Sequence, residues 1–347
     1  MVQYSQVAKR LAQHLCIFGD PKAGKSTLAA MAAEAGYKLI WISADNGHTI
    51  LDKLSQAAQE RINLIAIKDT KDNPRALHTV TKLTDGGMRH ICDMHGDINC
   101  VVCTKAKAPF TDINLNDTGP DTIVVIDSGS QVVESAINNV IKKEAKSADA
   151  VDGYKLDYGD WATVGAVMSR ILSNIQVAPY HVILIAHSAE TEMEDGTKKL
   201  VPLLGTVPFS RNVGKYFDHI VYCTVRLNKH QIGSRTTFML NVVTGSRTDA
   251  AIEDGKDLDI LKFFGPPRSL SQGEIMTTSV QEQSNTEAKP VLEDVVDALG
   301  PTSKPVGQPA TVNVTTIREL EKAENNEAGA TKLSALELLK LMNKKKV

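Results

Sequence analysis

The sequence has little of several features that assign a protein to a class. Aromatic residues make up 5% of its 347 residues, and the formal net charge is −2. A net charge so close to zero excludes a global attraction to nucleic acid or membranes, so any basic surface is local. No stretch approaches the roughly 18 apolar residues of a membrane span. Residues 1–15 have no signal-peptide apolar run, so we expect a cytoplasmic protein without a membrane partner.

The number of cysteines argues against a disulfide-bonded protein. There are five, an odd number, and without a secretory signal this number favours a reducing compartment over disulfide bonding. Cys16 and Cys223 lie in apolar runs and are expected in the core. The other three lie with one histidine in a single segment, ICDMHGDINCVVC, at residues 91–103.

This segment has the spacing of a metal site. Its ligands would be Cys92, His95, Cys100 and Cys103, in the pattern C-x2-H-x4-C-x2-C. Paired ligands two residues apart each hold one side of a tetrahedral ion, and thiolates with imidazole select zinc over magnesium or calcium. The spacing predicts a closed, structural zinc site with His90 as a spare ligand. The alternatives are free buried thiols and a CxxC redox pair.

Apolar runs alternate with helical patterns between residues 14 and 265. Continuous Ile- and Val-rich runs are typical of parallel strands that are buried on both faces. Segments 26–36 and 160–177 are long enough for crossover helices. The pattern predicts a doubly wound α/β domain with a mostly parallel sheet and antiparallel strands toward its C-terminal edge. The expected strands are 14–19, 38–43, 62–67, 122–127, 181–186, 219–223 and 237–243.

Composition divides the chain into parts. Residues 1–267 are expected to form the core. Within it, 69–121 has few apolar runs and is predicted to be an insertion that zinc folds. Residues 265–347 contain no aromatic side chain and six of the thirteen prolines. We therefore predict a disordered linker at 268–314, because such a composition buries too little surface to fold.

The last part, 315–347, is predicted to be a partly disordered tail with short helices. Ser334 and Glu337 there have the spacing of a capping box at the start of a short apolar stripe. A helix this short is marginal alone. It is either a fraying end or a docking peptide for a protein partner.

A phosphate-binding loop follows the first expected strand. The segment GDPKAGKST fits G-x-x-x-x-G-K-[ST], and its place between a strand and a helix supports the motif. Backbone N–H groups and the helix N-terminus form an anion cradle there. We expect Lys25 to reach the β- and γ-phosphates and the Ser26 hydroxyl to coordinate Mg²⁺. The expected ATP-binding residues are Gly19, Asp20, Pro21, Lys22, Ala23, Gly24, Lys25, Ser26 and Thr27.

A second Mg²⁺ residue is expected at the end of a buried strand. TIVVID ends in Asp127, which would hold the ion through water. The alternative is that Asp127 only caps the helix that begins near Ser128.

The order of these motifs resembles the RecA/RadA recombinase core. Within it, the phage-encoded minimal RecA-like ATPases that act in single-strand annealing or recombination are the most similar. The resemblance covers residues 14–250. It implies ATP hydrolysis, single-stranded DNA as a partner, a ring or filament of identical subunits, and the cytoplasm of a host cell.

The resemblance also implies roles for three residues outside the loop. Asp45 follows the second expected strand, where the family usually has a glutamate that polarises the attacking water; the alternative is a turn aspartate in Asp-Asn-Gly. His187 follows the strand at 181–186, where recombinases carry a γ-phosphate sensor; the alternative is an ordinary strand-end histidine. Arg247 is the preferred basic finger toward a neighbouring subunit, although an ordinary surface arginine is an equal alternative. The other candidates for the finger are Arg226, Lys229 and Arg235.

Two segments fall where the family has its DNA-binding loops, at 146–160 and 188–215. Phosphate contacts and base stacking would come from their basic and aromatic side chains. These are Lys155, Lys198, Lys199, Arg211, Tyr154, Tyr158 and Phe209.

The expected function is that of an ATP-hydrolysing, single-stranded-DNA-binding recombination or annealing protein. One alternative is a hexameric helicase or another DNA motor. The other is an ATP-gated annealing or scaffold protein with negligible turnover. In each case the C-terminal helix is a candidate contact for a partner such as a single-strand-binding protein.

Overall fold

The computed structural model describes residues 12–45, 47–144, 154–192, 196, 198–226, 229–233, 241–247, 255 and 259–268. Apart from Arg268, the predicted linker and tail lie outside these residues, and so does the predicted helix near Ser334. No helix in the described ranges is both long and apolar enough to cross a membrane.

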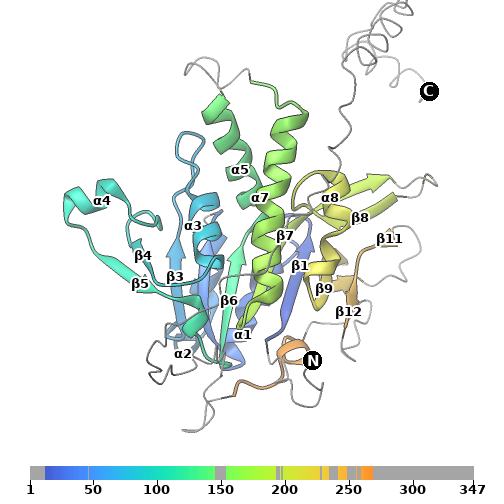
Figure 1. Cartoon of the computed structure of the whole chain (residues 1–347). Coiled ribbons are helices and arrows are strands. Elements are labelled where there is room, and N and C mark those ends of the chain that lie inside the picture. The colour runs from blue at the N-terminus through green and yellow to red at the C-terminus, as the bar shows by residue number, and fades with distance from the viewer. Residues whose placement is uncertain are drawn as a thin grey trace, which may run out of the picture. The chain divides into compact units, whose positions relative to one another are not determined.

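The central sheet is mostly parallel, as the apolar runs predict. The main path of described strands has the order β10-β9-β1-β7-β6-β2-β3, and along this path every pair is parallel except β10 with β9. The phosphate-loop strand β1 lies between β9 and β7 (Figure 1). The strands are β1 (His14–Gly19), β2 (Lys38–Ser43), β3 (Ile62–Ala66), β6 (Thr122–Asp127), β7 (His181–Glu192), β9 (His219–Arg226) and β10 (Lys229–Gly233).

Helices cover both faces of the sheet. Alternate residues of β1 point to opposite faces, so Leu15 and Ile17 enter one core cluster while Cys16 and Phe18 enter the other. The first cluster contains residues of α1 (Lys25–Glu34), η2 (Gly47–Lys53) and α2 (Gln56–Gln59). The second contains residues of α3 (Arg75–Thr84), α5 (Gly129–Glu144) and α7 (Tyr158–Val177), which lie together across one face in Figure 1.

The structure differs from the prediction along β7. This strand continues six residues beyond the expected end at 186 because Ser188–Glu192 pair with β8 (Lys198–Pro202) in an antiparallel hairpin. The segment 188–215, predicted to be a loop, also contains α8 (Val207–Arg211) and η4 (Val213–Tyr216). It is therefore largely regular structure.

The C-terminal edge is antiparallel only in part. β10 and the short β12 (Gly245–Ser246) run antiparallel to β9, as expected. However, β11 (Asn241–Val242) pairs with β8 in parallel. Of the strand predicted at 237–243, residues 241–243 are described, and the first two of them form β11.

The segment 69–121, predicted to be one insertion, has two parts. The helix α3 packs on α5 and α7, and Leu77, Val80 and Leu83 belong to the main core. The second part is a small unit of β4 (Arg89–Cys92), α4 (Val101–Ala106) and β5 (Phe110–Ile113), followed by η3 (Leu115–Asp117). We call residues 89–113 the cysteine module; in Figure 1 it stands to one side, beyond β3.

Candidate functional site

The phosphate loop joins β1 to α1 and needs glycine at both ends. A Cβ on Gly19 would come within 2.2 Å of the Cys223 carbonyl oxygen on β9. Gly24 has a φ of +89°, a left-handed conformation that glycine adopts without strain. The sequence therefore permits a tight loop that ends at the N-terminus of α1.

Lys25 lies inside this loop. Its side chain is buried, and its Nζ donates hydrogen bonds to the carbonyl oxygens of Gly19 at 2.9 Å and Asp20 at 2.8 Å. Burial lowers the pKa of Lys25, and nearby acidic groups, first Cys223 and then Asp127, oppose that shift. Two carbonyl oxygens of the loop thus accept hydrogen bonds that the Lys25 ammonium could instead donate to the oxygens of a bound phosphate.

Asp127 ends β6 next to the loop and is 1% exposed. Burial and the charge of Asp45 raise the pKa of Asp127 to about 7, while a hydrogen bond with Ser26 and the charge of Lys25 lower it. Within the described part of the chain its Oδ2 is buried and has no hydrogen-bond partner. Buried acceptors are rarely left unpaired. A carboxylate oxygen beside a hydroxyl is a donor set that suits Mg²⁺, so Ser26 and Asp127 fit the ion.

Asp45 and His187 lie at the same edge of the sheet. Asp45 accepts a hydrogen bond from the Gly47 N–H at 2.9 Å, so it forms the expected turn. Burial lowers the pKa values of Lys25 and His187, and the charge of Asp45 opposes part of that shift in each. Burial is the main cause that lowers the pKa of His187, and the ring Nδ1 is buried without a partner among the described atoms. The structure therefore brings Lys25, Asp45, Asp127 and His187 together.

Arg247 is not part of this group. It follows β12, whose Ser246 pairs with His219 at the opposite end of β9 from the loop. Its guanidinium donates to the Lys215 carbonyl oxygen at 2.7 Å and lies 3.6 Å from Asp218. A role for Arg247 in a neighbouring subunit stays a prediction. Of the other finger candidates, Arg235 lies outside the described residues.

Some of the side chains predicted to contact DNA are bonded or packed within the protein, and others are exposed. Lys198 forms an ion pair with Glu190 at 2.6 Å, and Arg211 donates to the Thr191 hydroxyl at 2.8 Å, so both brace the hairpin. Phe209 packs against the core, and the Tyr154 hydroxyl donates to Asp160 at 2.9 Å. Tyr158, at the start of α7, is 92% exposed, and Lys155 is also exposed.

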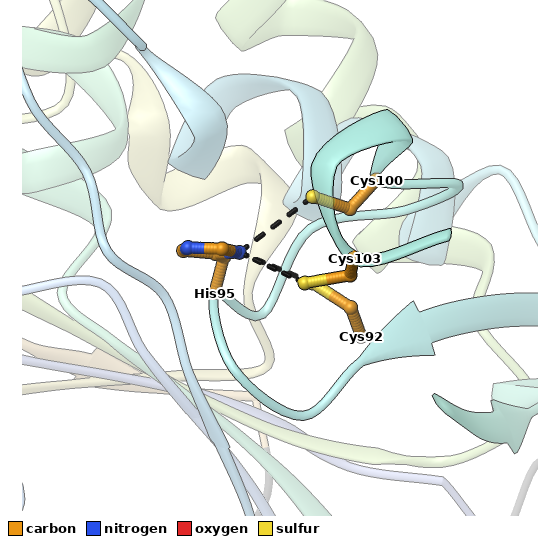
Figure 2. Close-up of side chains that lie close together, drawn as sticks. All are labelled: Cys92, His95, Cys100 and Cys103. Atoms are coloured by element: carbon orange, nitrogen blue, oxygen red, sulfur yellow. Dashed lines mark hydrogen bonds between the residues drawn. The ribbon is translucent and has the colours of Figure 1, made fainter. Parts of the chain in front are cut away.

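The cysteine module gathers the four predicted metal ligands (Figure 2). Their ligand atoms all lie within 4.8 Å of one another. His95 Nδ1 is 3.1 Å from the sulfur of Cys103, 3.6 Å from that of Cys100 and 3.9 Å from that of Cys92. With Zn–S bonds of about 2.3 Å, ligands on a tetrahedron lie roughly 3.5–3.8 Å apart. The cluster therefore has the dimensions of a zinc site.

The start of α4 favours a thiolate at this cluster. Burial alone would raise the pKa of Cys100, but hydrogen bonds from the backbone and thiol of Cys103, with others from Cys92 and Val102, lower it. Burial and the neighbouring thiols raise the pKa of Cys103 to about 12. A cation suits a pocket where thiols crowd together in this way. His90, the spare ligand, instead stacks on Phe110 at 4.4 Å.

The module is fastened to the carboxyl end of β3. The carbonyl oxygen of His95 accepts a hydrogen bond from the Lys68 N–H at 3.0 Å. A Cβ on Gly96 would meet the Ala66 carbonyl oxygen at 2.7 Å, so only glycine permits this approach. The Thr79 hydroxyl on α3 donates to the Gly96 carbonyl oxygen at 2.9 Å.

Sequence reasoning missed three residues around the phosphate loop. The Ser188 hydroxyl donates a hydrogen bond to the Asp20 carboxylate. Ser130 Oγ accepts from the His187 N–H at 2.9 Å. The His230 ring on β10 lies against Gly24, where an added Cβ would be 2.8 Å from its Nδ1. A hydroxyl directly after His187, in the segment IAHS, is a signal that could have found Ser188.

Two solved structures are similar at low identity. The crystal structure of the RadB recombinase is 12% identical, covers 66% of this chain and 83% of its own, and has a TM-score of 0.33. A prototypical ATPase from the type III secretion system of pathogenic bacteria is 15% identical, with a TM-score of 0.37. The match to it covers 61% of this chain and about half (51%) of that chain. TM-scores this low bear on neither mechanism nor partners.

No curated protein matches the chain. A family model described as an AAA domain matches residues 11–250, which include the phosphate loop, Asp127 and the cysteine module. This match covers more than half of the 347 residues. The protein therefore belongs to the AAA domain family and is a P-loop ATPase.

Proposed function

We propose that the protein is a phage-type, DNA-dependent ATPase that binds single-stranded DNA and promotes annealing or recombination. The observation that carries the ATPase part is the group Lys25, Asp45, Asp127 and His187 at the carboxyl edge of the sheet. Within the described residues, Asp127 and His187 each have a buried atom without a hydrogen-bond partner. The DNA part rests on the order of the motifs and on their resemblance to RecA-like recombinases.

Residues Gly19–Thr27 would bind the phosphates of ATP through backbone N–H groups. Lys25 would exchange its loop carbonyl partners for phosphate oxygens, and Ser26 and Asp127 would hold Mg²⁺, Asp127 through water. The bound ion neutralises charge on the β- and γ-phosphate oxygens.

Asp45 would orient the attacking water and accept its proton, as general bases in such sites do. His187 would lie near the γ-phosphate, where its free Nδ1 can form a hydrogen bond. Arg247 would act on the site of the next subunit in a ring or filament. The reaction converts ATP and water to ADP and phosphate in the cytoplasm of a host cell.

Single-stranded DNA would contact the start of α7 and the β7–β8 hairpin. Tyr158 is available there for stacking on a base, and Lys155 for phosphate contacts. The C-terminal tail would contact a partner such as a single-strand-binding protein.

The test is ATP hydrolysis with and without an unstructured single-stranded oligonucleotide. We expect at least severalfold stimulation in the wild-type protein and none in K25A. No stimulation of an active ATPase would contradict the role in DNA binding. Directional unwinding of a duplex would favour a motor, and annealing that survives in K25A would favour a scaffold.

We also propose that Cys92, His95, Cys100 and Cys103 hold one structural zinc ion. Support comes from the ligand spacing and from the fit of the distances to a tetrahedron. Metal analysis of purified protein is expected to give one zinc per chain, and the double variant C100S/C103S less than a fifth of that. Metal-free wild-type protein with ordered residues 89–113 would contradict the proposal.

A further inference from the structure

The strand β7 belongs to two parts of the molecule. Its first residues pair with β1 in the central sheet, where His187 is opposite Gly19 at the start of the phosphate loop. Its last residues pair with β8, from Ser188 opposite Pro202 to Glu192 opposite Lys198. One continuous strand therefore runs from the phosphate loop into the β7–β8 hairpin, and the change of partner falls between His187 and Ser188.

Asp20 connects the loop to this point. Its side-chain carboxylate accepts a hydrogen bond from the Ser188 hydroxyl. Its main-chain carbonyl oxygen accepts a hydrogen bond from Lys25 Nζ at 2.8 Å. Asp20 thus contacts the phosphate-binding lysine on one side and the base of the hairpin on the other.

The base of the hairpin is held as a unit. The Leu203 N–H donates to the His187 carbonyl oxygen at 2.8 Å, just beyond β8. Ser130, near the start of α5, donates to the Leu203 carbonyl oxygen at 2.8 Å and accepts from the His187 N–H at 2.9 Å. Both strands of the hairpin are therefore attached at the same place.

The hairpin itself is braced. Glu190 and Lys198 form an ion pair across the two strands at 2.6 Å. Arg211 on α8 donates to the hydroxyl of Thr191, which is buried. A braced hairpin moves as a whole when its base moves, because packed elements shift between discrete arrangements rather than bend continuously.

We infer that Asp20 and Ser188 form a positioning link through which nucleotide binding in the phosphate loop shifts the β7–β8 hairpin. The link rests on the proposed function, since it requires that the loop bind nucleotide. The Lys25 ammonium has three N–H donors, two of which the Gly19 and Asp20 carbonyl oxygens accept, and in the link the oxygens of a bound phosphate take the place of the Asp20 carbonyl. The backbone at Asp20 then changes its partners, and the Ser188 hydrogen bond carries the change into β7.

The test is hydrogen–deuterium exchange of residues 188–202 with and without a slowly hydrolysed ATP analogue and Mg²⁺. In the wild-type protein we expect exchange in this segment to change severalfold on nucleotide binding. In S188A the response is expected to fall to less than a third of that, although nucleotide affinity stays within about threefold. S188T keeps the hydroxyl and is expected to respond like the wild type.

Two further variants keep the result interpretable. D20A removes the other half of the link and is expected to behave like S188A when it is saturated with nucleotide. S169A is the matched serine control; it removes a hydroxyl on α7 that contacts Tyr216 and is expected to leave the response intact.

A wild-type response in both S188A and D20A would overturn the link and leave the ATPase assignment standing. A wild-type protein that binds no nucleotide would overturn the proposed function, and the link with it. An unresponsive S169A would also overturn the link, since the response would then depend on any lost hydroxyl.

Discussion

The buried polar groups at the two ends of the strands β9, β1 and β7 differ in their hydrogen bonding. At their amino ends three histidines, His14, His181 and His219, are each at most 4% exposed. At the carboxyl end lie Lys25, Asp127 and His187. Both ends bury ionisable groups, with Asp127 coming from the neighbouring strand β6. Among the described residues, the groups of this comparison that have a buried atom without a hydrogen-bond partner lie at the carboxyl end.

The amino-end histidines are all hydrogen-bonded. His14 Nε2 lies 3.2 Å from the Tyr180 carbonyl oxygen, and His181 Nδ1 accepts from the Gln13 N–H at 3.0 Å. His219 lies between the Ser246 hydroxyl at 2.9 Å and the Gln13 side-chain oxygen at 3.0 Å. The edges of Phe263 and Phe264, in α9 (Leu261–Phe264), pack on two of the rings.

The carboxyl end contrasts with this. Four buried side-chain atoms have no partner in the described ranges; two belong to Asp127 and His187, and the others to Trp41 and Thr81. Unpaired buried polar groups cost free energy, and a fold retains them where a ligand satisfies them. We infer that the hydrogen-bonded histidines stabilise the sheet, whereas burial of Asp127 and His187 costs stability and serves the proposed ATP site.

Among the variants that test this difference between the two ends, D127N is expected to have the largest effect. We expect ATP hydrolysis to fall by about 100-fold because an amide holds Mg²⁺ poorly. The free energy of unfolding, measured with urea at pH 8 in EDTA, is expected to rise. Because burial raises the pKa of Asp127 to about 7, the ionised form costs on the order of a few kcal/mol at that pH. Lower stability in D127N would show that this carboxylate stabilises the fold.

H219A tests the other end. Removing this ring leaves a cavity and removes the hydrogen bonds to Gln13 and Ser246, so we expect the free energy of unfolding to fall by roughly 2–4 kcal/mol. Hydrolysis per folded molecule is expected to stay at the wild-type rate. The exposed His78 provides the control, and H78A is expected to change stability by less than about 0.5 kcal/mol. An equal loss of unfolding free energy in H219A and H78A would contradict the claim that the buried histidines at the amino ends of the strands stabilise the sheet.

The smallest effect concerns pH. Burial lowers the pKa of His181 to about 4, below the value of about 6.5 in unfolded chains. The unfolded state therefore binds a proton first as the pH falls, and stability is lost between about pH 6.5 and pH 4. Between pH 7 and pH 5 this group alone is worth about 2 kcal/mol.

H181Q, which keeps a hydrogen-bond acceptor, is expected to lose less stability than the wild type over that interval in urea unfolding. An identical pH dependence in the two proteins would show that His181 is not the group that titrates.

Much of the fold could be predicted because the signals are local. The buried strands appear as Ile- and Val-rich runs, and the spacing of the phosphate loop and of the cysteine segment carries the chemistry of each. The structure confirms that Cys92, His95, Cys100 and Cys103 come together, and their metal stays a prediction. Asp127 could be located because it ends a buried strand.

Other features depend on contacts that a single sequence does not contain. The extension of β7 has polar residues in SAETE, and its partner β8 decides that it is a strand. The helix α3 joins the main core through side chains spaced three apart, which a scan for apolar runs does not detect. The buried histidines at the amino ends of the strands depend on hydrogen bonds between residues far apart in the sequence, such as Gln13 and His219, which are 206 residues apart.

We propose that the carboxyl end of the sheet is built for ATP rather than for stability. Phosphate release from ATP and Mg²⁺ by the wild type and by K25A tests it most directly, with K38A, which removes an exposed lysine paired to Asp121, as the matched control. We expect about a 100-fold lower rate in K25A, a wild-type rate in K38A and no loss of folding in either. Comparable rates in K25A and the wild type would contradict it.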